Sequence, residues 1–385
     1  MFENFEGPKH IIGTQAPDER RRFFRQDWVN HDADGVYYDP RQYLHISGVP
    51  LEIIDTLYTP EGEWKYTFDI DPYNLSPEEL LEKADEIMPP IYEAGHLSAA
   101  RGVHELMNLH TWHEHGRNVA HLAFSLVKQA GHDIPEQRRT ILAAFAHDMA
   151  NIQTRGAHNQ YGSEVAAKVF PKLKNDTQQF ELIKKAAFLH NGASDAIVAD
   201  ATTTEERLAL YAKHDTPASL AVRIADKIDN GRWRANSSSA ALTREFMDTA
   251  IGEKGEAGQR DHTLSNLLFS TTEAGFDESS GLFVWKVQFN PFISEEEISV
   301  FNPDIVTHSE EGSGIYVPIN LRTNPKNAES LADFKKAVEV FNTVNGKRVR
   351  RAMDAALLLF KDQNICGGSL IIQVSNTGQE IVYNY

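Results

Sequence analysis

The sequence places an imidazole and a carboxylate side by side at the end of an apolar run. The run Ile141–Ala146 leads directly into His147 and Asp148. Such a run predicts a buried segment, and a carboxylate is rarely buried without a partner. A metal ion supplies such a partner, so we expect His147 and Asp148 to bind a metal.

Histidines are concentrated in the same part of the chain. Nine of the 16 histidines lie between His96 and His158, which scatter over a surface would not produce. Most of these nine fall outside the predicted inner faces of helices, and we expect them to be surface or packing residues. The positions whose helical spacing allows them to converge are His115, His147, Asp148, His158, His190 and Asp226.

Imidazole and carboxylate ligands together favour a divalent transition metal. Mn, Fe, Ni, Co and Zn accept this ligand set better than Ca does. Adjacent residues of a helix diverge by about 100°, so His147 and Asp148 can hold one ion between them, or Asp148 can bridge two ions. Two ions roughly 3.5–4 Å apart can clamp a phosphate and generate a hydroxide nucleophile at neutral pH. We therefore expect one or two ions.

The composition disfavours some partners and compartments. A net charge of −17 argues against binding to duplex DNA or to anionic membranes, because neutralising phosphates needs clustered Lys and Arg. The single cysteine, Cys366, rules out an internal disulfide and a thiolate zinc cluster. We find no signal peptide at the start of the chain and no stretch near the roughly 20 apolar residues that span a bilayer. We expect a soluble, cytoplasmic protein.

Helical patterns dominate the middle of the chain. Ser76, followed by proline and two acidic residues, predicts the start of a helix that ends at Pro89-Pro90. Residues 96–240 are predicted to form an all-helical metal-binding domain. Its helices are expected at about 98–131, 135–149, 158–170 and 177–190, and around 220–230.

The flanking segments show other patterns. Residues 1–95 are expected to form a partly β N-terminal arm, with a strand over Trp64–Ile70 where large apolar and polar residues alternate. Residues 235–280 are rich in Ser, Thr and Gly and predict surface loops with a helix or two. Residues 241–385 are predicted to be a linker and an α+β domain. Its strands are expected at 282–289, 314–321, 369–374 and 380–383, and its helices at about 328–344 and 347–360. The expected fold class is mainly α.

Five short motifs follow one another within about residues 98–232. They are His115-Gly-Arg-Asn-Val-Ala, Phe-Ala-His147-Asp148, His158-Asn-Gln-Tyr-Gly-Ser-Glu, Leu-His190 and Arg-Ile-Ala-Asp226. In order and context they resemble the HD superfamily of metal-dependent phosphohydrolases. The resemblance implies a helical bundle whose core metal ligands are His115, His147, Asp148 and Asp226. For members with two ions it adds His158 and His190, and it places Asp148, His158 and His190 in the catalytic centre.

The chain also departs from the family pattern. Many members follow His-Asp with a Gly-Lys pair whose lysine helps to bind phosphate, but Met149-Ala150-Asn151 follow here. Other cations must then face the substrate, and the candidates are Arg117, Lys184, Lys185 and Lys227, with Arg155 as a further one. The Gly-Tyr-Pro signature of the cyclic-dinucleotide branch is absent after His190. The segment Ala225–Asn230 is similar to one in enzymes that cleave guanosine polyphosphate alarmones.

The resemblance implies hydrolysis of a phosphoester in a small phosphorylated substrate, a nucleotide or related molecule. Two other functions share the same sequence features. Six-ligand members of the superfamily include mixed-valence di-iron oxygenases that cleave C–C or C–P bonds. A non-catalytic regulator would instead bind a nucleotide in the bundle and pass the signal to the C-terminal domain. The acidic surface disfavours a nuclease acting on single strands, and the sequence allows a homo-oligomer.

Overall fold

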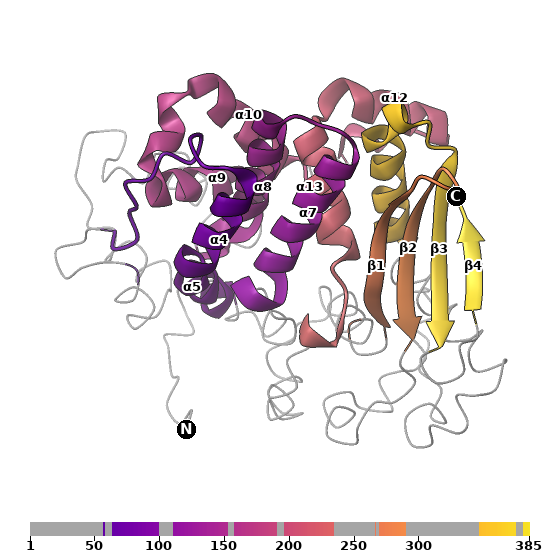
Figure 1. The fold of residues 1–385 in the computed structure, drawn as a ribbon, viewed down its shortest axis with the longest axis horizontal. Helices are drawn as coiled ribbons and strands as arrows, with labels where there is room; N and C mark the ends of the chain where they lie inside the picture. Colours follow the sequence, from indigo (N-terminus) through magenta and orange to yellow (C-terminus); the bar gives the residue numbers. More distant parts are fainter. Residues whose placement is uncertain are drawn as a thin grey trace, which may run out of the picture.

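The fold is described from a computed structural model of the chain. The described residues are 57, 64–99, 111–152, 158–190, 196–234, 266, 269–289, 346–374 and 380–385. They form a helical bundle that lies beside a four-stranded sheet (Figure 1). This mainly helical architecture with a small C-terminal sheet confirms the predicted fold class. Among the described residues, no helix is both long and apolar enough to cross a membrane.

The first well-defined helix begins where the sequence predicts. Helix α4 spans Pro77–Ile87, and Glu79 N donates to the Ser76 hydroxyl while the Glu79 carboxylate accepts from Ser76 N. This reciprocal capping satisfies two backbone donors that a helix start leaves free. Helix α5, Pro89–Ala99, begins directly after α4. The two prolines therefore start a new helix, as the fixed φ of proline favours at a first turn.

The predicted strand at Trp64–Ile70 is an extended segment instead. Its exposure alternates from residue to residue, but only Trp64 has a β-bridge assignment. Lys65 N donates to Leu57 O and Phe68 N donates to Val169 O, both at 2.8 Å. The alternation therefore reflects packing of an extended chain against the bundle. Residues 1–56 and 58–63, where the rest of the β arm was predicted, lie outside the described residues.

Helix α8, Ile134–Met149, is the centre of the bundle. Every residue from Thr140 to Met149 is buried, because the helix packs against neighbours on several sides. The helices that surround it are α7 (Arg117–Gln129), α9 (His158–Val169), α10 (Thr177–Phe188) and α13 (Pro217–Ile228). Helices α9, α10 and α13 agree with the predicted helices to within a few residues. Helix α7 ends near the predicted residue but begins only at Arg117, about 19 residues after the predicted start. The segment between α10 and α13 adds α12, Thr204–His214, which is not among the predicted helices.

Two glycines shape the bundle. Gly131 adopts φ 79° after α7 ends, a left-handed conformation that favours glycine and that fits the predicted helix end. Gly162 lies where α9 crosses α8, and a Cβ there would lie 1.7 Å from the carbonyl oxygen of Ala146. The close crossing of α8 and α9 therefore depends on glycine, and it occurs one turn from His158 and beside His147.

The sheet has the order β1-β2-β3-β4, and its strands are β1 (Phe269–Asp277), β2 (Leu282–Phe289), β3 (Gly367–Val374) and β4 (Glu380–Asn384). The outer pairs are antiparallel, whereas β2 and β3 are parallel, so the chain must cross over between them. A helix that covers residues 346–359 precedes β3, and Phe360 stacks on Phe276 and Phe283 of the sheet. The predicted elements at 314–321 and 328–344 lie outside the described residues.

Strand β1 corrects the prediction of loops with helices across residues 235–280. Only Phe269 of its nine residues is buried, so Ser and Thr can occupy the other positions without loss of core. A bulge between Thr271 and Glu273 shifts the register, which breaks the two-residue alternation that would mark a strand.

The sheet and the bundle share one hydrophobic core. Thr271 N donates to Asn230 O at 2.8 Å, and Arg207 of α12 forms an ion pair with Asp354 at 2.8 Å. Helix α5 continues across the predicted boundary between residues 95 and 96, and the boundary at 240/241 lies outside the described residues. The division into 1–95, 96–240 and 241–385 stays a prediction.

Candidate metal centre

Six side chains converge inside the bundle, and they come from separate elements. His115 lies on a π-helical turn, Trp112–Gly116, before α7, and His147 with Asp148 lies in the last turn of α8. His158 begins α9, His190 follows the end of α10, and Asp226 lies in the last turn of α13. The structure thus brings together the predicted ligands His115, His147, Asp148, His158, His190 and Asp226.

Asp148 lies between two groups of histidines. Its Oδ2 is 3.5 Å from His115 Nε2, and its Oδ1 is 3.3 Å from His158 Nε2. Potential ligand atoms of His115, His147 and Asp148 all lie within 4.8 Å of one another, and so do those of Asp148, His158 and His190. Asp226 Oδ1 adds a carboxylate 3.5 Å from His115 Nε2. The arrangement provides two triads that share one carboxylate.

The histidines are oriented by acceptors on their outer sides. His147 Nδ1 lies 2.6 Å from Ala144 O, and His190 Nδ1 lies 2.5 Å from Ala187 O. A carbonyl can only accept, so Nδ1 carries the proton in both rings and a neutral ring has its lone pair at Nε2. A histidine that binds a metal usually donates its other N–H to a carbonyl or carboxylate. The donor set therefore fits a divalent transition metal.

Burial and neighbouring charges shift the pKa values of these histidines in different directions. Burial lowers the pKa of His147 and holds that of His190 well below its usual range, so both rings stay neutral. Burial and Arg234 also act to lower the pKa of His115, but Asp148, Asp226 and a third carboxylate, Asp229, raise it to about 9. The carboxylates thus create a strong preference for a cation at His115, which either a proton or a metal can satisfy.

Asp229 is a residue of the centre that the sequence analysis did not select. Its Oδ2 lies 2.6 Å from His115 Nδ1, and both side chains are buried. It therefore orients His115 as the two carbonyls orient His147 and His190. The spacing could have indicated this role, because Asp229 follows Asp226 by three residues, which places both on one side of the helix end.

The four predicted substrate-binding cations have different surroundings. Lys227 Nζ contacts Asp226 Oδ2, and its side chain is only 11% exposed. Arg117 is paired with Asp85 at 3.0 Å, Lys184 lies 3.8 Å from Glu164, and Lys185 is exposed. Lys227 is thus the member of this set that contacts the cluster. Arg155 lies outside the described residues.

Two buried arginines also contact this end of α13. Arg234 Nη1 donates to Asp229 O at 2.8 Å, and Arg348 Nη2 lies 3.5 Å from Asp226 O. Burial, followed by the charge of Arg234, lowers the pKa of Arg348 to about 10. Both guanidiniums bind backbone carbonyls at a helix C-terminus, where cations are favourable. Arg348 comes from the C-terminal helix, so no local pattern could have indicated it.

A further His-Asp pair, His214-Asp215, lies in a different environment. Asp215 Oδ1 lies 2.6 Å from Arg223 Nη2, and the Ser219 hydroxyl donates to it at 2.8 Å. Both charged side chains are almost fully buried, and Arg223 also packs on Tyr211. The buried ion pair between Asp215 and Arg223 holds α12 and α13 together.

A helical bundle with this His and Asp cluster defines a metal-binding domain of the His-Asp type. Residues 112–231 match the family model of the HD domain, and the match includes all six converging side chains. Residues 112–231 of the chain therefore form an HD domain. Neither a curated protein nor a solved structure matches the chain. The domain and its buried cluster indicate a metal-dependent, hydrolase-type activity.

Proposed function

We propose that the protein is a metal-dependent phosphohydrolase that cleaves a phosphoester of a nucleotide or a related small molecule. The observation that carries the proposal is the pair of triads that share Asp148. Two cation positions joined by one carboxylate suit a phosphate group, whose oxygens need positive charge on more than one side.

The six residues divide naturally between two ions. His115, His147, Asp148 and Asp226 would hold the first, and Asp148, His158 and His190 would hold the second. Mn, Fe, Ni, Co and Zn all suit such mixed nitrogen and oxygen ligands. When bound, these ions would supply Lewis acidity toward phosphate oxygens and lower the pKa of a coordinated water.

The protein's own residues set the geometry for this reaction. Asp148 would contribute to both proposed positions, because each of its oxygens faces a different histidine. The carbonyls of Ala144 and Ala187 hold the rings of His147 and His190, so that Nε2 of each can serve as a ligand. Lys227 Nζ lies at the edge of the cluster beside Asp226 and can donate a hydrogen bond to a phosphate oxygen. Asp148, His158 and His190 are the residues we assign to the catalytic centre.

The test is an assay of the full chain with generic phosphomonoester and phosphodiester substrates, with Mn or Ni added and with O₂ present or removed. We expect turnover that does not need O₂ and that Asp148→Asn reduces by at least a hundredfold. His132→Ala, a histidine outside the cluster, is the matched control and should leave turnover unchanged. A chain that holds two ions and turns over neither substrate class would contradict the proposal, and a requirement for O₂ would favour an oxygenase.

A further inference from the structure

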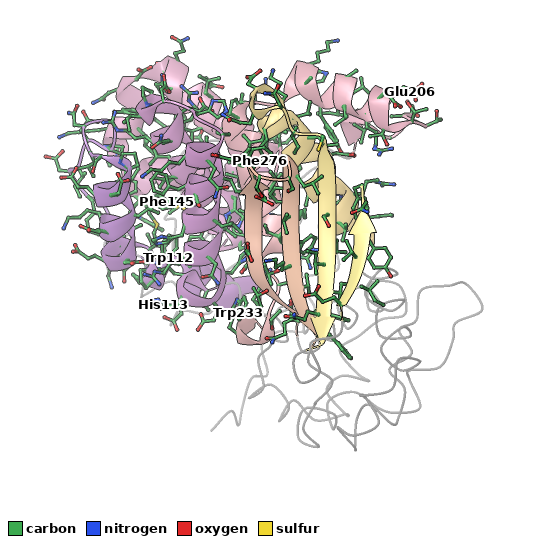
Figure 2. The ribbon with its side chains drawn as sticks, turned by 45° about the vertical axis from the view of Figure 1, so that its right-hand side comes forward. Trp112, His113, Phe145, Glu206, Trp233 and Phe276 are labelled. Atoms are coloured by element: carbon green, nitrogen blue, oxygen red, sulfur yellow. The ribbon has the colours of Figure 1, made fainter. Side chains whose placement is uncertain are left out.

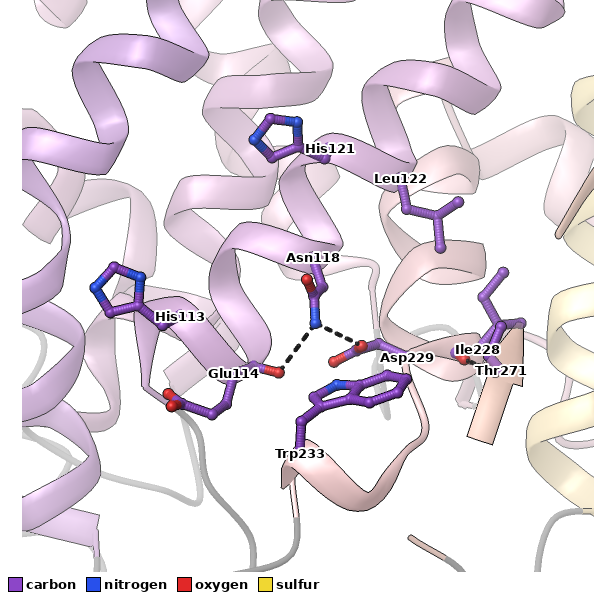
Figure 3. A pocket seen from close by; sticks show the side chains of 9 residues that line it. All are labelled: His113, Glu114, Asn118, His121, Leu122, Ile228, Asp229, Trp233 and Thr271. Atoms are coloured by element: carbon purple, nitrogen blue, oxygen red, sulfur yellow. Dashed lines mark hydrogen bonds between the residues drawn. The ribbon is translucent and has the colours of Figure 1, made fainter. Parts of the chain in front are cut away.

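A cavity of about 650 Å³ lies beside the metal centre (Figure 3). Asp229 forms part of its wall, and the same side chain contacts His115 at Nδ1. The other ligand atoms approach His115 at Nε2, so the cavity lies on the opposite side of this ring. An occupant of the cavity would therefore contact the outer partner of a metal ligand.

The cavity is built partly from the HD domain and partly from the chain that follows it. His113, Asn118 and His121 come from the π-helical turn and α7, within the residues that match the family. Trp233 and Thr271 lie beyond the matched segment, on a short 3₁₀ turn, Arg232–Arg234, and on β1. Figure 2 places His113 and Trp233 at the same end of the bundle. Residues after 231 therefore complete this cavity, and the segment that matches the HD family does not form it alone.

The lining is unsuited to a phosphate group. Among the residues that the structure describes, the cavity lining includes the acidic residues Glu114 and Asp229 and no lysine or arginine. Burial lowers the pKa of His121, and the charge of Arg117 acts in the same direction, so this imidazole is neutral near pH 7. An occupant should be uncharged or should carry hydrogen-bond donors, because a carboxylate wall repels an anion.

Trp233 offers a flat apolar surface in this cavity. Its side chain is 40% exposed. It lies close to Gly231, where a Cβ would approach the six-membered ring to 2.3–2.5 Å. The lack of a side chain at Gly231 therefore allows the indole to lie close to the backbone. A partly exposed indole is a stacking surface for a planar ring.

Hydrogen-bond acceptors lie close to this surface. Asn118 Nδ2 donates to Glu114 O at 3.2 Å and to Asp229 Oδ1 at 3.3 Å (Figure 3). Both partners are acceptors, which fixes the orientation of the amide and leaves its carbonyl oxygen to accept from another group. Glu114 lines the same cavity. A ring that bears N–H donors on its edge complements this wall.

We propose that the cavity binds a nucleobase, stacked on Trp233 and hydrogen-bonded to Asn118 and Glu114. The choice of a nucleobase among planar donor-bearing rings rests on the proposed function, which takes a nucleotide. The base can belong to the substrate or to a separate nucleotide effector. In both cases Asp229 connects the occupied cavity to His115.

The experiment measures binding of adenosine, guanosine and cytidine to the metal-loaded full chain by calorimetry, with inorganic phosphate as a further probe. We expect at least one nucleoside to bind and Trp233→Ala to weaken it by about tenfold or more, since stacking on an aromatic residue contributes strongly. Trp233→Phe should retain most of the affinity. Tyr385→Ala, which removes an exposed aromatic ring at the sheet, should not change it.

A second variant, His121→Trp, fills the cavity from its rim and leaves Trp233 in place. It should also abolish nucleoside binding. No binding of any nucleoside, or unchanged binding in both Trp233→Ala and His121→Trp, would overturn the proposal. The same titration in Asp148→Asn separates this proposal from hydrolysis, because nucleoside binding should persist there while turnover is lost. A nucleoside that raises KM occupies the place of the substrate base, and one that changes kcat alone acts as an effector.

Discussion

The Nε2 atoms of His115 and His147 lie 3.2 Å apart in the interior of the bundle. His147 is held by a carbonyl at Nδ1 and stays neutral, so its Nε2 presents a lone pair to His115. Two ring nitrogens at this distance need a proton or another cation between or beside them. The carboxylates of Asp148 and Asp226 attract the same charge from either side. This pair therefore lies at the first of the two cation positions that we propose.

Selective loss of ions should follow from the two triads. We expect His158→Ala and His190→Ala to retain one ion per chain, because the triad around His115 and His147 remains intact. His147→Ala should retain the other ion, whereas Asp148→Ala should weaken both sites. Elemental analysis of each purified variant measures the stoichiometry. Equal loss in all four variants would contradict the division into two positions that share Asp148.

Metal should stabilise the folded chain. A ligand that binds only the folded state stabilises it by about 2.7 kcal/mol at a hundred times its dissociation constant. We expect Tm to rise on addition of Mn or Ni to the metal-free protein and to fall again with chelator. Asp148→Ala should respond much less at the same metal concentration. A Tm that is independent of metal in the unmodified chain would argue against a site formed by folding.

Asp229 should act on metal affinity through His115. Removal of the outer partner of a metal-binding histidine typically lowers affinity by roughly 10–100-fold. We expect Asp229→Ala to produce a loss of this size in a metal titration, because His115 Nδ1 then lacks its acceptor at 2.6 Å. Asp229→Asn keeps an oxygen that can accept, so its loss should be smaller. Equal affinity of Asp229→Ala and the unmodified chain would show that other contacts orient His115.

Asp215 should affect stability and leave metal binding intact. Breaking a buried ion pair by removing one partner costs about 3–5 kcal/mol, because the other charge stays buried. Asp215→Ala removes the partner of Arg223, so we expect a loss of this order in denaturant unfolding. Its ion content at a temperature below its Tm should match that of the unmodified chain. A loss of ions from the folded variant would place Asp215 in the metal centre instead.

Local sequence patterns were sufficient to predict much of the fold and the convergence of the six side chains. The cap at Ser76 and the apolar stripe of α13 are decided by neighbours in sequence, so their helices were predictable. The convergence of the six side chains was predictable because each lies at a helix end or on an inner face and in a family motif. Their role as metal ligands and the substrate stay predictions.

Contacts between distant segments were not predictable from those patterns. Arg348 reaches Asp226 only because the C-terminal helix packs on the end of α13, which depends on the tertiary fold. Arg117 was a candidate for the substrate by its place next to His115, but its side chain turns to Asp85 on α4. The cavity at Trp233 likewise needs β1 beside α7. The spacing of residues along one helix does not show which distant segments pack against it.

Gly162 gives the sharpest link between packing and the metal centre. A Cβ at this position would lie 1.7 Å from Ala146 O, a backbone atom that no side-chain rotation can move. Gly162→Ala must therefore push α9 away from α8, and overpacking of this kind costs about 1–3 kcal/mol or more. Because His158 begins α9 and Asp148 lies in the last turn of α8, the same shift should lengthen their 3.3 Å contact and release the second ion.

Gly346→Ala is the matched control, since a Cβ there meets nothing within 4 Å and alanine favours a helix. Unfolding curves and ion content measure both effects, and a Gly162→Ala chain with unchanged stability and two ions would show that the helices cross farther apart.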